Sequence, residues 1–190
     1  MPHQYSTALS HMILAGTGLY CMIQYRHGEI CQLPCATFGI IITNSVLGIW
    51  RWGNPDHGDK IEKPYNFTFF LQSIFVMPFI AGQMWLMNGY ERAIAYLHPM
   101  LSCIPLTAYF VDKNNKEDVI DLLMVLSVLS CGALSYQINN YYGMAAAISF
   151  SLNHFYINNK DNIFDVPGRD FYNYALCFFT YFAYRAVVVM

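Results

Sequence analysis

Charged residues are confined to short segments of this 190-residue chain, and the long stretches between them carry no charge at all. The charge-free windows are residues 1–25, 30–50, 64–90, 93–111, 122–159 and 171–184. Most of them reach the roughly 20 residues that an α-helix needs to cross a bilayer. With 56% hydrophobic and 12% charged residues, the chain also has too little polar surface for a water-facing globule. The pattern therefore predicts an integral membrane protein.

Seven helices fit into these windows. The window at residues 122–159 is assigned two of them, because a single straight helix of that length would extend about 57 Å, well beyond the hydrocarbon core of a bilayer. The break between the two is predicted at Gln137–Asn140, where two asparagines follow each other. The predicted spans are Tyr5–Tyr25, Ile30–Trp50, Asn66–Met87, Tyr90–Val111, Val119–Gln137, Tyr141–Ile157 and Phe171–Met190.

The connections between these spans alternate in size. Tight hairpins follow the first, third and fifth spans, around Arg26–Gly28, Asn88–Gly89 and Asn139–Asn140, whereas longer, charged loops follow the second, fourth and sixth. We therefore expect an all-α membrane protein with a single domain over residues 1–190. Its fold would be a compact bundle of about seven transmembrane helices, within a range of six to eight, with short hairpin loops on one face and longer charged loops on the other.

Basic residues indicate which face is cytoplasmic. Seven lie on the face that holds the N-terminus and three on the opposite face: Arg51, Lys60, Lys63, Lys113, Lys116, Lys160 and Arg169 against Arg26, Arg92 and Arg185. Because Lys and Arg favour cytoplasmic loops, we expect a cytoplasmic N-terminus. We expect the endoplasmic reticulum or another endomembrane as the location.

Several classes of function have no support in the composition. The net charge is −2 and no cluster of Lys and Arg occurs, so we expect no nucleic-acid partner. The six cysteines form no C-x-x-C pair. Three histidines, His11, His98 and His154, fall inside predicted spans, but His98 enters from the opposite face and lies too deep to share one ion with the other two. We therefore expect neither a metal nor a cofactor.

Aromatic residues gather near the predicted span ends. An amphipathic ring prefers the headgroup level of a bilayer, so we interpret these residues as an interfacial belt rather than as site residues. They are Tyr5, Trp50, Trp52, Tyr65, Tyr90, Tyr109, Tyr141, Tyr142, Tyr156 and Tyr172.

Polar side chains within the spans form the candidate site. Counting 1.5 Å per residue places seven of them in the half of the membrane next to the N-terminal face: Ser10, His11, Asn44, Gln72, Asp121, Asn153 and His154. From these we select five candidate ligand-binding residues: His11, Asn44, Gln72, Asp121 and His154. The longer loops would cover the layer with charged residues, among them Asp161, Arg169 and Asp170. Plain hydrogen bonding between helices is the competing and commoner explanation for such residues.

One stripe of small residues predicts close helix packing. Gly143, Ala147 and Ser151 recur at intervals of four in the sixth span, which lets a neighbouring helix approach closely.

Catalytic residue patterns are missing from the sequence, which contains no Ser-x-x-x-His, His-x-x-x-His or Gly-x-Ser-x-Gly spacing. We therefore expect a non-enzymatic protein that binds a small or lipidic ligand, or packs with other membrane proteins, with membrane lipids as partners. One alternative is a lipid-modifying enzyme in which His11 or His154 acts as general base and Asp121 orients it. Another is a channel or carrier lined by Gln83 and His98 on the proline-kinked third and fourth spans.

Overall fold

The computed structural model describes residues 5–25, 33–54, 56–111, 117–158, 161–163 and 165–188, and about 89% of these are helical. The all-α class is therefore confirmed. The hairpin predicted around Arg26–Gly28 and the predicted start of the second span at Ile30 lie outside the described residues.

Each predicted span coincides with one helix or with two consecutive helices. The fourth span is divided at Ser102, because Pro105 has no N–H to bond to the Leu101 carbonyl. The sixth span continues from an α-helix into a π-helical segment. The elements are α1 (Tyr5–Tyr25), α2 (Leu33–Gly53), the 3-10 helix η1 (Gly58–Ile61), α3 (Glu62–Met87), α4 (Arg92–Leu101), α5 (Cys103–Val111), α6 (Glu117–Gln137), α7 (Tyr141–Ser151), the π-helix η2 (Leu152–Ile157), β1 (Asn162–Ile163), β2 (Val166–Pro167) and α8 (Gly168–Val188).

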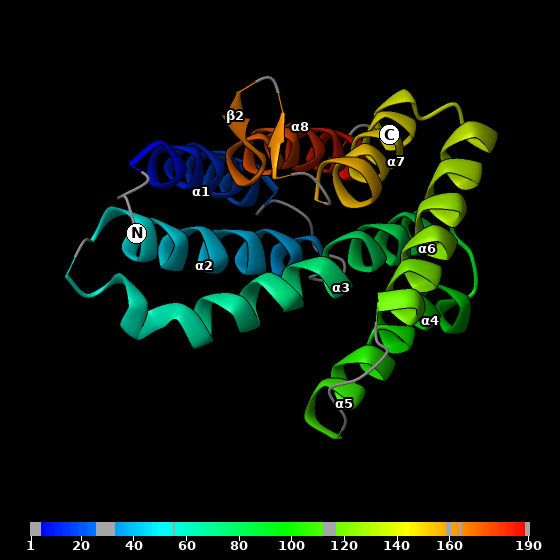
Figure 1. Ribbon diagram of the computed structural model, residues 1–190. Coiled ribbons are helices and arrows are strands. Elements are labelled where there is room, and N and C mark those ends of the chain that lie inside the picture. The colour runs from blue at the N-terminus through cyan, green and yellow to red at the C-terminus, as the bar shows by residue number, and fades with distance from the viewer. Residues whose placement is uncertain are drawn as a thin grey trace.

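Six of the helices pack in a closed ring. Each contacts the next in the order α1, α2, α3, α6, α7 and α8, and α8 returns to α1 (Figure 1). The helix α3 also contacts α8 across the ring, while α4 packs on the outside of α3 and continues into α5. The core lies inside the ring, where Leu14, Phe38, Ile80 and Leu176 are fully buried.

Within the described residues, five helical segments are long and apolar enough to cross a membrane. They are Tyr5–Tyr25, Leu33–Gly53, Gly58–Met87, Arg92–Val111 and Asp118–Gln137. The remaining two predicted spans correspond to α7 with η2, which have 11 and 6 residues, and to α8, which carries Arg169, Asp170 and Arg185. The structure is thus compatible with an integral membrane protein, and the seven-span arrangement stays a prediction.

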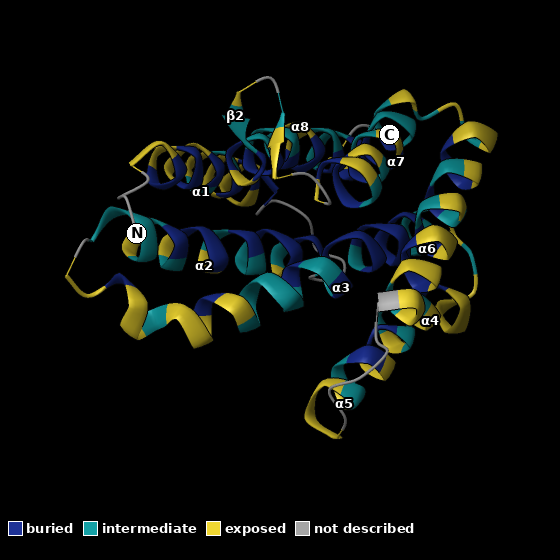
Figure 2. Ribbon diagram, viewed as in Figure 1, coloured by how far each residue is buried: buried dark blue, intermediate teal, exposed yellow. Residues whose placement is uncertain are grey.

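Apolar residues lie on the outside of the bundle as well as in its core. Leu9, Phe110 and Leu129 have exposed fractions of 53%, 71% and 63%, and exposed residues recur along most of the helices (Figure 2). Polar side chains such as Asn44 and Gln83 are buried between helices. A chain whose helices are surrounded by hydrocarbon is expected to be arranged in this way.

The predicted small-residue face of α7 does mediate close packing. A side chain at Gly143 would collide with the Ser135 hydroxyl of α6 and would lie 2.7 Å from a methyl group of Met84 on α3. The Ala147 side chain lies against Gly132 of α6. The α7 helix therefore approaches α6 and α3 through its smallest residues.

A short β-hairpin precedes α8. Its two strands pair antiparallel, with Asn162 opposite Pro167 and Ile163 opposite Val166. Asp165 lies in the turn with a φ angle of 62°, and the N–H of Gly168 donates to the Asp161 carbonyl at 2.7 Å. The hairpin therefore folds back over the first turn of α8.

Candidate functional site

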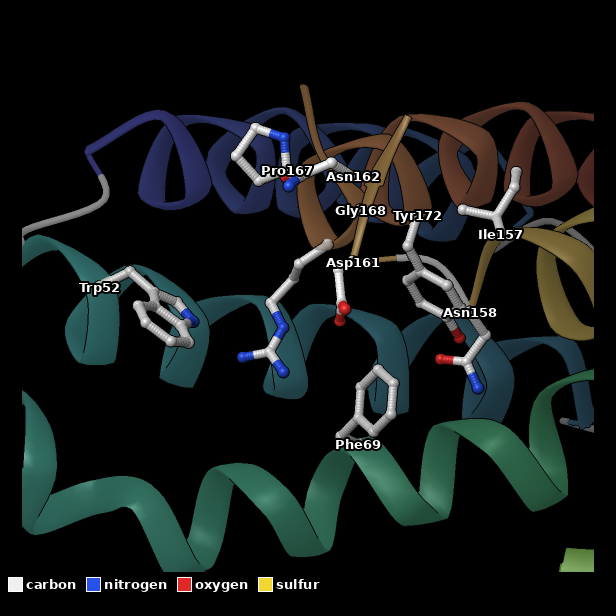
Figure 3. A pocket seen from close by; sticks show the side chains of 10 residues that line it. Trp52, Phe69, Ile157, Asn158, Asp161, Asn162, Pro167, Gly168 and Tyr172 are labelled. Carbon is white, nitrogen blue, oxygen red and sulfur yellow. The ribbon is translucent and has the colours of Figure 1, made fainter. Parts of the chain in front are cut away.

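A cavity of about 370 Å³ lies where α2, α3, η2, α8 and the β-hairpin meet. Figure 3 shows Trp52 of α2 and Phe69 of α3 on one side, with Tyr172 of α8 and Asp161 on the other. Its lining combines aromatic and apolar side chains with polar and charged ones. The lining residues are Trp52, Phe69, Ile157, Asn158, Asp161, Asn162, Pro167, Gly168, Arg169 and Tyr172.

Two arginines and two aromatic rings form one group beside this cavity. The guanidinium carbon of Arg51 lies 4.9 Å from the ring centre of Trp52 and 5.0 Å from that of Tyr65. The corresponding distances for Arg169 are 5.0 Å and 5.7 Å. A cation is attracted to the face of an aromatic ring at such distances. These rings therefore hold both positive charges at the same end of the bundle.

The two arginines differ in their remaining partners. Arg51 pairs with the Glu62 carboxylate at 2.7 Å and donates to the Asn66 amide oxygen at 2.9 Å. Among the described residues, Arg169 makes no ion pair, although it lines the cavity together with Asp161. The cavity is thus lined by one arginine that makes no ion pair with another described residue, and by one carboxylate.

Hydrogen bonds between α1 and α8 position Arg169 and Tyr172. The Asn173 amide donates to the Ser10 hydroxyl at 2.9 Å, and the Ser10 hydroxyl lies 2.9 Å from the Thr7 carbonyl and 3.5 Å from a carboxylate oxygen of Asp170. Asp170 and Asn173 are both buried. These contacts fix the first turn of α8 against α1.

A series of rings leads from the cavity to His11. The ring of Tyr172 lies 5.5 Å from that of Phe69, which stacks on Tyr65 at 6.5 Å. The Tyr65 hydroxyl then lies 3.3 Å from Nε2 of His11. His11 is therefore joined to the cavity wall through aromatic side chains.

Behind the cavity lies a polar cluster on α2 and α3. The Asn44 amide donates to the Gln72 side-chain oxygen at 3.3 Å, and the Thr68 hydroxyl donates to the Asn44 side-chain oxygen at 3.0 Å. Within the described part of the chain, Nδ1 of His11, Nε2 of Gln72 and the Ser45 hydroxyl have no hydrogen-bond partner. Buried polar atoms are nearly always paired, so each of these is a candidate contact for a polar group.

A second polar pair joins α6 to η2. Nε2 of His154 lies 2.9 Å from a carboxylate oxygen of Asp121, whose side chain is 57% exposed. The His154 ring stacks on Phe150 with the ring centres 5.7 Å apart. The π-helical turn contains His154, and such turns are frequent at functional sites.

Four of the five predicted ligand-binding residues fall into these two clusters. The structure brings Asn44 to Gln72, and Asp121 to His154, whereas His11 contacts Tyr65. None of the five lines the cavity directly. Their predicted role in binding a ligand stays a prediction.

Several residues around the cavity were not predicted as site residues. The interpretation of Tyr65 and Tyr172 as interfacial belt is wrong, because their exposed fractions are only 1% and 6%. Tyr65 is in contact with His11 and Phe69, and Tyr172 with Phe69. Phe69 was not selected from the sequence, and Trp52 was assigned to the interfacial belt. Phe69 lies four residues after Tyr65 in the same helix, and this spacing could have indicated that the two rings are neighbours.

The residues predicted to line a channel have other contacts. Nε2 of His98 lies 3.0 Å from the Ser130 hydroxyl, which accepts a hydrogen bond from the Trp85 indole at 2.8 Å. Gln83 is buried on α3 beside Gly82, where an added side chain would lie 2.7 Å from the Ala95 carbonyl of α4. The two proline-containing helices are therefore closely packed at this level.

Comparison with models of known protein families, with curated proteins and with solved structures finds no match to this chain. Function is therefore argued from the geometry of the cavity and of the two polar clusters.

Proposed function

We propose that this chain is a multi-pass integral membrane protein that binds a small amphipathic molecule or a lipid in the cavity between α2, α3, α8 and the β-hairpin. The observation that carries this proposal is the cavity itself. Its volume of about 370 Å³ lies within the range of about 300–1,000 Å³ that is typical of ligand sites. Its aromatic walls suit an apolar or cationic group, and Arg169 suits an anionic one.

The membrane part of the proposal is supported by five apolar helices and by the outward-facing large apolar side chains. We take α7 with η2, and α8, as the sixth and seventh spans, with a cytoplasmic N-terminus and an endomembrane location. The cavity then lies at the cytoplasmic end of the bundle, because the C-terminal end of α2 and the first turn of α8 line it. Membrane lipids would be the immediate partners.

Trp52 provides a direct readout of ligand binding, because its indole lines the cavity. The chain has three tryptophans, so replacing Trp50 and Trp85 by Phe leaves Trp52 as the single fluorophore. This variant, in lipid nanodiscs, would be titrated with a fatty acid, a monoacylglycerol and a lysophospholipid. We expect a saturable change in Trp52 emission with at least one of these probes.

Two arginine variants distinguish ligand binding in the cavity from binding elsewhere on the protein. Arg169→Gln should weaken binding by about tenfold or more, since a hydrogen bond to a charged group contributes about 1.5–3 kcal/mol. Arg92→Gln is the matched control, because Arg92 begins α4 and does not line the cavity. No saturable change with any probe, or equal effects of the two substitutions, would contradict the proposal.

The His154–Asp121 pair favours a second candidate function, a lipid-modifying enzyme. The carboxylate at 2.9 Å could orient the imidazole for proton transfer, as a general base requires. Purified protein would then hydrolyse or transfer a phospholipid acyl chain, and both His154→Ala and Asp121→Asn would remove the activity. His98→Ala is the control histidine variant. Turnover that persists in the His154 and Asp121 variants would eliminate this candidate.

A further inference from the structure

A second, apolar hollow lies on the outer surface between α7 and α8, which run side by side (Figure 1). We call it the α7–α8 groove. It measures about 560 Å³, and apart from Ser149 and Tyr174 its lining is apolar. One wall comes from Ala145 and Ile148 of α7 and Leu152 of η2, and the other from Phe171, Ala175 and Phe178 of α8. Each set recurs at the three- and four-residue spacing of one helix face.

The groove begins at the cavity. Ile157, at the end of η2, lines both, and Phe171 of the groove is the chain neighbour of Tyr172 of the cavity. Ile157 is 6% exposed, so its buried side chain lies between the cavity and the α7–α8 groove. A molecule with a polar head and an apolar tail could therefore contact both across Ile157.

The length of the groove matches one leaflet of a bilayer. Along α8 it extends from Phe171 to Phe182, which corresponds to about 16 Å at 1.5 Å per residue. Half of the hydrocarbon core is about 15 Å thick. The groove therefore has the length of a lipid chain that starts at the cytoplasmic headgroup level.

The cavity rim fits the head of a zwitterionic phospholipid. Arg169, which has no ion pair among the described residues, can bind a phosphate through its guanidinium fork. Asp161 lines the same cavity and can pair with an amine, and the Tyr172 ring can attract a quaternary ammonium group. Both charges of the head would thus find a partner of opposite sign or an aromatic face.

We infer that the ligand of the cavity is a phospholipid, with its head beside Arg169 and Asp161 and one acyl chain in the α7–α8 groove. This inference rests on the proposed function, which it narrows to one class of ligand.

Three probes in the Trp52 assay test the inference. They are a single-chain phosphocholine lipid, the monoacylglycerol with the same chain, and glycerophosphocholine, which has the head alone. We expect the single-chain lipid to bind on the order of a hundredfold more tightly than the head alone, because the chain adds apolar contact. The monoacylglycerol, which lacks the phosphate, should bind about tenfold or more weakly than the lipid.

Groove variants test the position of the chain. Phe178 is 64% exposed, so Phe178→Ala removes a groove wall without opening the core, and Phe110→Ala on α5, where Phe110 is 71% exposed, is the matched control. Phe178→Ala should weaken the single-chain lipid on the order of tenfold and leave glycerophosphocholine unchanged. Ala175→Phe, which fills part of the groove without adding a second tryptophan, should act in the same direction.

The outcomes separate this inference from the proposed function. Equal affinity for the lipid and for the head alone would contradict the placement of the acyl chain in the α7–α8 groove. The same holds if neither groove variant changes the affinity. Either result would leave the cavity as a binding site. Equal affinity for the lipid and the monoacylglycerol would overturn the phosphate contact. If none of the probes used in either assay binds, the proposed function itself fails.

Discussion

Gly48 determines how closely α1 can approach α2 beside His11. A side chain at this position would place its Cβ 2.5 Å from the imidazole ring. The ring is fully buried and is also held by Tyr65, so it has little freedom to move away. The absence of a side chain at Gly48 is therefore what gives His11 its place behind the cavity wall.

Gly48→Ala should lower the stability of the protein by about 1–3 kcal/mol, the usual cost of overpacking a filled site. Gly39→Ala in the same helix is the control, since nothing lies within 4 Å of the added Cβ. That substitution should be neutral or slightly stabilising, because alanine favours helix more than glycine. Thermal unfolding in one detergent measures both variants. Equal melting temperatures for the two would show that His11 is not packed against Gly48.

At the residue scale, the sequence predicted which polar side chains are buried better than it predicted their hydrogen-bond partners. Depth counting selected His11, Asn44 and Gln72, and all three are buried on the three helices that surround the polar cluster. It could not pair His11 with Tyr65, because span ends attract tyrosine for interfacial reasons as well. Only the fold shows that Tyr65 is buried against His11 and Phe69.

At the scale of elements, Asn140 ties the start of α7 to the end of α8. Its side-chain oxygen accepts from the Gly143 N–H at 3.0 Å, and its amide donates to the Ala186 carbonyl at 2.9 Å. One side chain therefore caps α7 and bonds to a carbonyl in the last turn of α8. Asn139 beside it has a φ angle of 57° and an exposed side chain.

Asn140→Ala should reduce stability by about 0.5–2 kcal/mol, the range measured for lost N-caps, and the lost bond to Ala186 should bring it toward the upper end. Asn139→Gly is the comparison variant at the adjacent position. It should be neutral or stabilising, because glycine adopts a positive φ without strain. Unfolding by heat or denaturant in detergent checks the pair. A destabilised Asn139→Gly with an unaffected Asn140→Ala would contradict the assigned roles.

Helix positions followed from the sequence because an absence of charge over about 20 residues leaves few alternatives to a helix. The break at Gln137–Asn140 was predicted correctly, since α6 ends at Gln137 and α7 begins at Tyr141. The prolines of the fourth span predicted a kink, and this span is divided at Ser102, three residues before Pro105. The π-helical turn at His154 was not predicted, because it depends on a local hydrogen-bond shift that hydropathy does not register.

At the scale of the whole molecule, the ring of six helices explains why a cavity forms at one end. The helices α2, α3 and α8 contact one another, and the cavity lies between their ends beside the hairpin and η2. The α4–α5 segment stays outside this ring and exposes Phe110 and Val111. Which helices would close the ring could not be read from the sequence, because any apolar helix face can pack against several others.

The proposed topology predicts that α3 crosses the bilayer. Asp59 and Glu91 are exposed and lie at its two ends, so Asp59→Cys should be cytoplasmic and Glu91→Cys should be on the opposite side. In a variant without native cysteines, a membrane-impermeant maleimide should label Glu91→Cys but not Asp59→Cys when it is added to the lumenal or extracellular side. Labelling of both from one side would place the ends of α3 in the same compartment.

The most direct test of the account is to locate the bound lipid. A phosphatidylcholine with a photoreactive group on its head would be incorporated with the protein into nanodiscs, and the labelled peptides would be identified by mass spectrometry. We predict labelling concentrated on the cavity segments around Trp52, Phe69 and residues 157–172, and reduced by Arg169→Gln. Labelling spread over the outer faces of α4 and α5, without enrichment at the cavity and unaffected by Arg169→Gln, would contradict it.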